Sequence, residues 1–500
     1  MPDHLDISPR FLRDGAHVLC DVVCHLVNLS IRNKCVPKCT KSAKVIPLYK
    51  KGSRLDVGNY RPVSILTSLS KIMERAVYIQ VVNHCKVNKI IYPLQSGFQK
   101  NYSTDTCLIH LQDHIRSEIS RGKFVGMMLL DVQKAFDSVN HEMLCEKIRL
   151  AGIDSEWFES YLEGRKQCVS VNEYKSDERT ITCGVPQGSL LGPWCYLVYS
   201  NDLPACVSCK VILYADDTIL IVSHKDINTV SNTLSQEGST CFQWLCNNRL
   251  SMHMGKTEVI VFSSKRKRCQ TKEFSIKLGA HTIEAQDSVK YLGLKIDSNL
   301  SCESIVSNIL SKCSARLKFC YRHQNCLDFK SRKTIITALV QCYFDYAVSS
   351  WFWSLTKGRL KKLQVAQNKL VRFILNFGPR SHIGQNELNQ IHMLNTRDRA
   401  CQLMLGHMFN IYHKTAPEYL CDKFGRIEHH HRTRRAALSF FLPRPLSIDQ
   451  SNFSYQGAKL WNEIPNQIKL CNSKDAFKLQ IKKWLKRRSE TSETNPFIII

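Results

Sequence analysis

The sequence predicts an α+β protein in which a β-containing part, ending near residue 300, precedes a helical part. A continuous apolar run, Phe124–Leu130, has the composition of a strand buried on both faces. Two shorter β-prone runs, Val211–Leu213 and Ile219–Val222, flank a tight turn and predict a hairpin. Beyond residue 300 the apolar residues instead keep helical spacing, as in Ile305–Leu317, Thr334–Phe344 and Leu360–Leu375.

Charge is the most informative feature of the composition. The 500 residues carry a net charge of +27, and residues 301–500 alone contain 32 Lys and Arg against 13 Asp and Glu. Such an excess favours a polyanionic partner for the C-terminal part, although a soluble basic surface without a partner is the alternative.

The sequence also indicates the cellular compartment of the protein. No apolar run reaches the ~18 residues that a membrane span needs, so we expect no membrane partner. The first residues lack the pattern of a secretory signal, and the 23 cysteines form no spacing typical of a disulfide framework. We therefore expect an intracellular protein, in the cytoplasm, the nucleus or both.

The first predicted hairpin carries cations. The segment Lys44–Gly52 alternates apolar and basic residues before a glycine turn, and Asn59–Ser64 follows it. The Arg61 guanidinium could bind a triphosphate through two hydrogen bonds, and Lys44 could add a point charge. Exposed lysines on a hairpin are also ordinary, so this segment leaves both interpretations open.

The next carboxylate follows the apolar strand. Helical spacing from Leu66 to Val87 leads towards this strand, which ends at Asp131. In the turn after it, Phe136 could pack against a substrate's sugar or belong to the core. Asp137 or Ser138 is expected to cap the next helix rather than to act in catalysis.

A glycine-rich loop and an acidic turn complete the candidate site. Gly184–Pro193 is rich in glycine and proline, and such a loop lets the backbone approach a ligand closely. The hairpin turn contains adjacent carboxylates, Asp216 and Asp217, which repel each other unless a cation compensates them. A solvated turn is the alternative. Together with Asp131 they could bind two Mg²⁺ ions for phosphoryl transfer.

These motifs, in this order, resemble the reverse transcriptases of non-long-terminal-repeat retrotransposons, and most of all the jockey-like (LINE-type) group. The matching segments are Lys44–Ser64, Asp131–Val139, Gly184–Pro193, Tyr214–Asp217, Lys256-Thr257 and Tyr291-Leu292-Gly293. The resemblance extends into the C-terminal half through Gln367-Asn368-Lys369 and Leu460–Pro465.

The resemblance implies a right-hand polymerase fold with fingers, a palm of antiparallel sheet and helices, and a helical thumb with a C-terminal extension. We expect an N-terminal segment over 1–40, fingers and palm over 41–300, thumb and connection over 301–425, and a basic region over 426–500. The implied substrates and partners are template RNA, a DNA primer or target, and deoxynucleoside triphosphates.

Residue roles follow by position in the motifs. Asp131, Asp216 and Asp217 would be catalytic and bind Mg²⁺. The implied nucleotide-binding residues are Lys44, Arg61, Phe136 as a gate against the ribose 2′-hydroxyl, Gln187, and Lys256 as an acid towards pyrophosphate. The implied primer-template residues are Tyr214, Tyr291, Leu292 and Gly293.

Three functional hypotheses stay open. The first is an RNA-directed DNA polymerase that copies element RNA by target-primed synthesis, with the nick made by an endonuclease absent from this chain. The second is a catalytically silent remnant of a truncated element that at most binds RNA. The third, a telomerase or an intron-encoded maturase, shares the palm motifs but not the C-terminal match. The sequence does not predict an oligomeric state.

Overall fold

The computed structural model describes residues 7–425, 438–442, 446 and 449–491. Part of the basic region predicted over 426–500 therefore lies outside the described residues. Within them, no helix is both long enough and apolar enough to cross a membrane.

The chain divides into two compact units that interleave along the sequence. Unit 1 comprises Met1–Phe98, Leu129–Leu220 and Gln236–Thr257, and unit 2 comprises Gln99–Met128, Ile221–Ser235 and Glu258–Ile500. The domain boundaries predicted at residues 40, 300 and 425 follow the order of the motifs and stay predictions.

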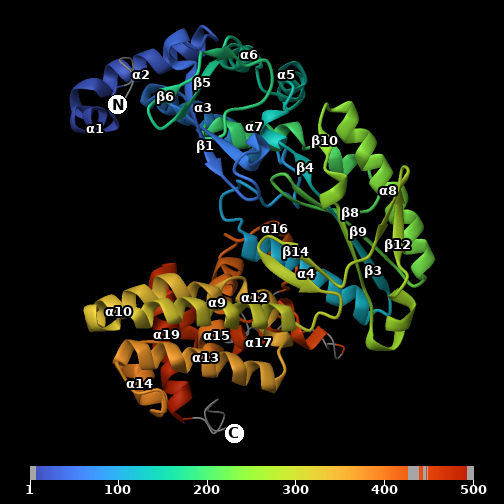
Figure 1. Cartoon of the computed structure of the whole chain (residues 1–500), viewed down its shortest axis with the longest axis vertical. Coiled ribbons are helices and arrows are strands. Elements are labelled where there is room, and N and C mark those ends of the chain that lie inside the picture. Colours follow the sequence, from blue (N-terminus) through green and yellow to red (C-terminus); the bar gives the residue numbers. More distant parts are fainter. Residues whose placement is uncertain (1–6, 426–437, 443–445, 447–448, 492–500) are drawn as a thin grey trace. The chain divides into compact units, whose positions relative to one another are not determined.

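Unit 1 combines helices with short strands (Figure 1). Its helices are α1 (Pro9–Asp14), α2 (Ala16–Arg32), α3 (Ser68–Val87), α5 (His141–Leu150), α6 (Glu156–Leu162), α7 (Leu191–Tyr199) and the end of α8 (Ile227–Asn247). Its strands are β1 (Ser42–Tyr49), β2 (Tyr60–Leu66), β4 (Val132–Gln133), β5 (Lys166–Val171), β6 (Tyr174–Lys175), β7 (Arg179–Thr180), β8 (Lys210–Tyr214) and β10 (Ser251–Met252).

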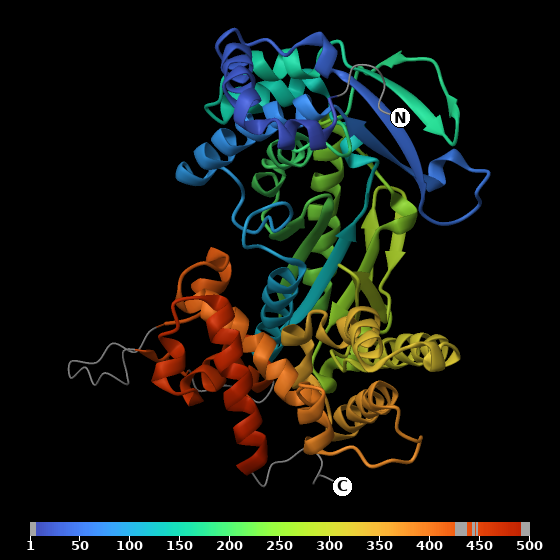
Figure 2. The same cartoon turned by 90° about the vertical axis from the view of Figure 1, so that its left-hand side faces the viewer.

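The predicted cationic hairpin forms. Strands β1 and β2 pair antiparallel with Leu48 opposite Arg61, and β1 continues the sheet by parallel pairing with β5. The sheet has the order β2-β1-β5-β6, with β7 also paired to β5. Figure 2 shows the loop of this hairpin projecting from the rest of unit 1.

The carboxylate-bearing strands belong to a second sheet, of order β11-β3-β9-β8. Every residue of β3 (Phe124–Leu130) is buried, which confirms the prediction of a strand covered on both faces. In β9 (Asp217–His224) the residues from Thr218 to Val222 are buried as well. Because the cores of these strands are apolar, polar side chains are confined to their ends.

Unit 2 is mostly helical, as predicted beyond residue 300. Its strands are β11 (Glu258–Phe262), β12 (Ser275–Leu278), β13 (His281–Glu284), β14 (Ser288–Tyr291) and β15 (Leu294–Asp297). Its longer helices are α4 (Thr104–Ser120), α9 (Glu303–Arg322), α10 (Phe329–Ile336), α13 (Lys357–Leu375), α15 (Thr396–Tyr412), α17 (Phe453–Glu463) and α19 (Lys474–Thr491). The shorter ones are α11 (Cys342–Asp345), α12 (Val348–Trp351), α14 (Gln385–Gln390), α16 (Glu418–Cys421) and α18 (Asn466–Lys469).

The helix expected over 334–344 is interrupted. After α10 the backbone makes a π-helical turn, Thr337–Gln341, before α11 begins. The hydroxyls of Thr334 and Thr337 donate to the carbonyls of Lys330 and Lys333, at 2.9 and 2.8 Å. Such back-bonding competes with the helical ladder and accompanies bends in helices.

Candidate active site

The acidic turn joins β8 to β9. Tyr214 ends β8, Ala215 and Asp216 form the turn, and Asp217 begins β9. Ala215 adopts a left-handed backbone conformation with φ of +57°, which is uncommon for a residue with a side chain. The turn therefore holds a strained residue immediately before the predicted ligands Asp216 and Asp217.

The third carboxylate follows β3 directly. Asp131 lies between β3 and β4, and its carbonyl accepts a hydrogen bond from the His253 amide at 2.8 Å. Because β4 pairs with β10, the chain brings Lys256 to the same place. The Lys256 ammonium lies 3.1 Å from the Asp131 carboxylate, an ion pair about half exposed to solvent.

Desolvation and mutual repulsion dominate the electrostatics. Burial among protein atoms raises the pKa of Asp216 above its ordinary value, and the charge of Asp131 adds to the rise. For Asp217 the same two causes, together with the charge of Asp216, raise the pKa to about 6. Asp217 keeps an exposed side chain, so it is crowded on one side and open to solvent on the other.

This donor set fits a divalent cation in its chemistry. The charge of Asp131 raises the pKa of both Asp216 and Asp217, so added positive charge would stabilise the ionised forms of these two, and carboxylate oxygens are the ligands that Mg²⁺ prefers. Among the described residues, no three His, Cys, Asp or Glu side chains converge closely enough to form a complete metal-binding group. Magnesium usually completes its shell with water and substrate phosphates.

Two cations of the β1–β2 hairpin act on the carboxylates. The charges of Arg61 and Lys50 lower the pKa of Asp216, and Lys50 acts on Asp217 in the same way. Lys44 lies on β1 opposite Ile65 and is not among these groups. Sequence reasoning missed Lys50, although it lies in the same alternating basic run.

Backbone hydrogen bonds hold the glycine-rich loop in place within unit 1. The amides of Gly184 and Val185 donate to the carbonyls of Val139 and Phe136, and the Gln187 carbonyl accepts from the Ser64 amide at 2.7 Å. Gly184 and Gly188 have φ of +85° and +135°. A Cβ on Gly188 would lie 2.3 Å from the Ser64 carbonyl oxygen, so the close approach requires glycine.

The prediction that Asp137 or Ser138 caps the next helix is wrong. The cap of α5 is Asn140, whose side chain accepts from the Met143 amide at 3.0 Å, and not Asp137 or Ser138. Asp137 instead accepts a hydrogen bond from Gln187 Nε2 at 2.8 Å. Burial raises the pKa of Asp137, with the Gln187 contact opposing the rise. Because Gln187 is 50 positions away, no local pattern could indicate this pair.

Phe136 belongs to an aromatic cluster. Its ring stacks on Tyr196 at a centroid distance of 5.0 Å and meets Phe98 edge-on at 6.1 Å. Tyr196 is buried, whereas Phe136 is half-buried and Phe98 exposed. The cluster fixes the Phe136 ring while leaving part of it accessible to a ligand.

Comparison with known proteins identifies the family. Residues 48–296 match the family described as "Reverse transcriptase (RNA-dependent DNA polymerase)". These residues form a reverse transcriptase domain. Over 352 residues it is 29% identical to the RNA-directed DNA polymerase of the mobile element jockey from Drosophila melanogaster, covering 68% of this chain and 38% of that protein. The counterpart from Drosophila funebris is 27% identical, with 70% and 39% covered.

These relatives place the chain with the jockey-like, non-long-terminal-repeat reverse transcriptases, as the motifs predicted. The chain spans well under half the length of the curated relatives it matches. Among solved structures, a telomerase from Candida tropicalis in complex with a telomeric RNA fragment covers 71% of this chain and 64% of its own, at 13% identity and a TM-score of 0.38.

Three of the four predicted primer-contacting residues, Tyr291, Leu292 and Gly293, lie in unit 2. Tyr291 ends β14, and Leu292 and Gly293 turn the chain into β15 with φ of +45° and +79°. The buried Tyr291 hydroxyl lies 3.5 Å from Cys107 Sγ, and the Tyr346 hydroxyl donates to the Leu292 carbonyl. Tyr214, the fourth predicted residue, is half-buried at the end of β8 in unit 1.

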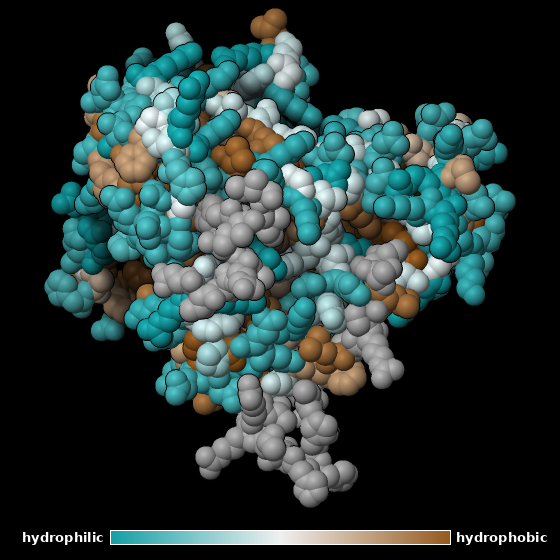
Figure 3. Space-filling model, turned by 90° about the horizontal axis from the view of Figure 1, so that it is seen from below, coloured by the Kyte–Doolittle hydropathy of each residue, from teal (hydrophilic) through white to brown (hydrophobic). Residues whose placement is uncertain are grey.

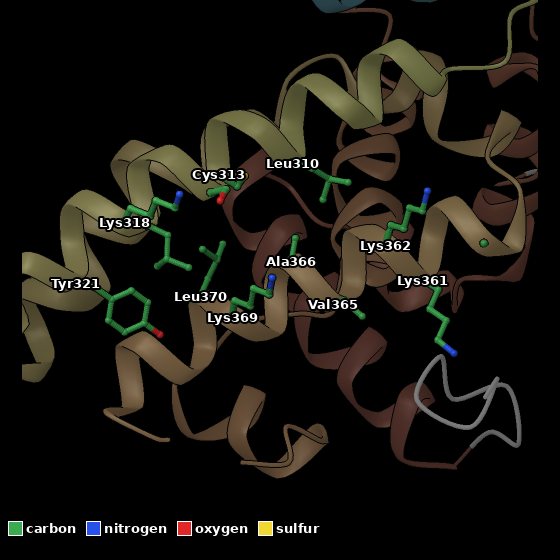
Figure 4. A pocket seen from close by; sticks show the side chains of 13 residues that line it. Leu310, Cys313, Lys318, Tyr321, Lys361, Lys362, Val365, Ala366, Lys369 and Leu370 are labelled. Atoms are coloured by element: carbon green, nitrogen blue, oxygen red, sulfur yellow. The ribbon is translucent and has the colours of Figure 1, made fainter. Parts of the chain in front are cut away.

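A groove between α9 and α13 in unit 2 has a volume of about 680 Å³. Apolar side chains such as Leu317 and Leu370 line it, together with lysines. Figure 4 shows Lys318 on α9 and Lys362 and Lys369 on α13 along the space between the helices. All three lysines are exposed, so the groove has an apolar floor and a cationic rim.

Proposed function

We propose that the chain is an RNA-directed DNA polymerase of a retrotransposon, which extends a DNA primer on template RNA. The observation that carries this proposal is the group of three carboxylates after β3 and at the β8–β9 turn, where two have raised pKa values. Groups with perturbed pKa values in one place are candidates for function. Family membership supplies the class of reaction.

The three aspartates would hold two Mg²⁺ ions. Bound ions would activate the primer 3′-hydroxyl and neutralise charge that develops on the phosphates. The pKa of Asp217 is raised to about 6 by burial and by neighbouring carboxylates, so a bound cation would stabilise its ionised form. Asp131 already balances the Lys256 ammonium, which would turn towards pyrophosphate as a proton donor.

The other residues would bind and select the nucleotide. Arg61 and Lys50 face the carboxylates and would bind the triphosphate, with Lys44 further along β1 as a more distant cation. Phe136, held by Tyr196, would exclude a ribose 2′-hydroxyl. Gln187 would lie beside the nucleotide, oriented by its hydrogen bond to Asp137.

The proposed partners follow from charge and family. Template RNA would contact the basic helical part, including the lysines of the α9–α13 groove, and Tyr291–Gly293 with Tyr214 would contact the primer. The primer itself would be a nicked DNA target.

Primer extension tests the proposal. The chain would be incubated with a DNA primer annealed to template RNA, Mg²⁺ and deoxynucleotides, beside Asp216→Ala. We expect extension by the parent and none by the variant. No extension by a parent that is folded and binds RNA would contradict the proposal and favour a silent remnant. Extension by Asp216→Ala would contradict the assignment of the carboxylates.

A further inference from the structure

The segment Leu94–Gly97 runs along the free edge of β8. The Leu213 amide donates to the Leu94 carbonyl at 3.1 Å, and the Ser96 amide donates to the Leu213 carbonyl at 2.8 Å. This parallel bridge brings a loop from between α3 and α4 to the strand that ends in the acidic turn.

One side chain of this segment is fixed on the turn. Gln95 is 1% exposed, and its Oε1 accepts hydrogen bonds from the Ala215 amide at 2.9 Å and from the Gly97 amide at 2.8 Å. Its Nε2 donates to the Ala215 carbonyl at 3.4 Å. The Gln95 amide thus contacts both peptide groups of Ala215, the residue immediately before Asp216.

The contacted residue is the strained one. A left-handed alanine costs about 1 kcal/mol relative to ordinary backbone and persists only where the surroundings determine it. Gly97 adds to this restraint, because a Cβ at that position would lie 2.3 Å from the Ala215 amide nitrogen. The backbone direction at Ala215 decides where the Asp216 side chain starts, and so where both carboxylates point.

We propose that Gln95 is a positioning residue for the catalytic carboxylates: its side-chain amide holds Ala215 in the left-handed conformation that presents Asp216 and Asp217 to the metal ions. This inference rests on the proposed function. It also names a role for a buried glutamine whose partner lies 120 positions away in the chain.

The alternative is a glutamine that merely stabilises the packing of Leu94–Gly97 on β8. The same region offers a matched control for that role. The Tyr92 hydroxyl donates to the Val211 carbonyl at 3.1 Å, on the same strand but away from the turn. Tyr92→Phe therefore removes one hydrogen bond to β8 without touching Ala215.

The first test compares Gln95→Met, which keeps side-chain volume and loses the acceptor, with Tyr92→Phe. Steady-state extension would give kcat and the KM for deoxynucleotide, and titration calorimetry would give the affinity for Mn²⁺ in the absence of substrate. For Gln95→Met we expect kcat to fall by about 10- to 100-fold with KM unchanged, and Mn²⁺ binding to weaken severalfold. Tyr92→Phe should match the parent in all three. Parent-like kcat and Mn²⁺ affinity in Gln95→Met would overturn the inference.

The second test distinguishes a loss of restraint at Ala215 alone from misfolding of the whole variant. Amide hydrogen exchange at Ala215 should be slow in the parent and fast in Gln95→Met, while Ile212 stays protected in both. Gln95→Glu keeps an accepting oxygen and should keep the Ala215 amide protected. This second variant keeps the inference testable if Gln95→Met does not fold. Fast exchange at Ala215 in the parent would overturn the inference. A parent without polymerase activity would defeat the proposed function alone, because Mn²⁺ affinity and exchange would still report on Gln95.

Discussion

At the scale of single residues, the ionised Asp217 carboxylate should lower the stability of the fold, although catalysis requires it. Its pKa of about 6 lies above the value near 4 of an unfolded chain, so ionisation costs stability as the pH rises through that interval. After allowance for solvent screening of an exposed carboxyl the cost is roughly 1 kcal/mol. Asp217→Asn should therefore abolish extension and raise the melting temperature in EDTA at pH 7.

Thermal melts in EDTA at several pH values check this. The gain from Asp217→Asn should be complete above pH about 6 and absent below pH about 4, where the parent carboxyl is protonated. Asp177→Asn, in an exposed loop, should change neither activity nor melting. A variant that melts below the parent at pH 7 would contradict the assignment of repulsion to Asp217.

Phe136 should control sugar selection. Its ring is held by Tyr196 and half exposed, so removing it opens space beside the nucleotide without emptying a closed core. For Phe136→Ala we expect incorporation of ribonucleotides relative to deoxynucleotides to rise about 10- to 100-fold, measured as the ratio of kcat/KM values. Phe242→Ala, an exposed aromatic on α8, is the control. An unchanged ratio in Phe136→Ala would rule out the gate.

At the scale of elements, the glycine-rich loop depends on its close contact with β2. Gly188→Ala would place a Cβ 2.3 Å from the Ser64 carbonyl oxygen at a φ of +135°, and should destabilise unit 1 by about 3 kcal/mol or more. Gly164→Ala also has a positive φ, +64°, but nothing lies within 4 Å of its Cβ. It should cost only about 1 kcal/mol. Denaturant titration of both variants would separate steric contact from backbone strain, and equal losses would contradict the contact.

Elements with a local signal were predictable, and contacts between distant segments were not. A few neighbouring residues are enough to predict the strand β3, the turn between β8 and β9 and the helix α5. By contrast, the hydrogen bonds from Gln187 to Asp137 and between Gln95 and Ala215 join residues that are far apart in the sequence and meet only in the folded chain. The cap prediction for Asp137 failed for this reason: local preference favoured a cap, and a tertiary hydrogen bond prevailed.

At the scale of the whole molecule, the net charge of +27 is the property that favours a polyanionic partner. On the face shown in Figure 3 hydrophilic residues predominate, and apolar ones form small separate patches. The groove between α9 and α13 combines lysines with an apolar lining. If this groove contacts RNA, its lysines should contribute through phosphates and release counterions.

Charge reversal in the groove tests that contribution. Lys362→Glu with Lys369→Glu should weaken binding of a template RNA at low salt and lower the slope of log Kd against log salt concentration by about 1 to 2, because two phosphate contacts are lost. The matched control is Lys71→Glu with Lys86→Glu, two exposed lysines on α3, which changes net charge equally. If both pairs lower affinity and slope alike, the effect belongs to the overall charge. Only a larger loss in the groove variant assigns RNA to α9 and α13, since long-range attraction depends on net charge whereas counterion release depends on contact.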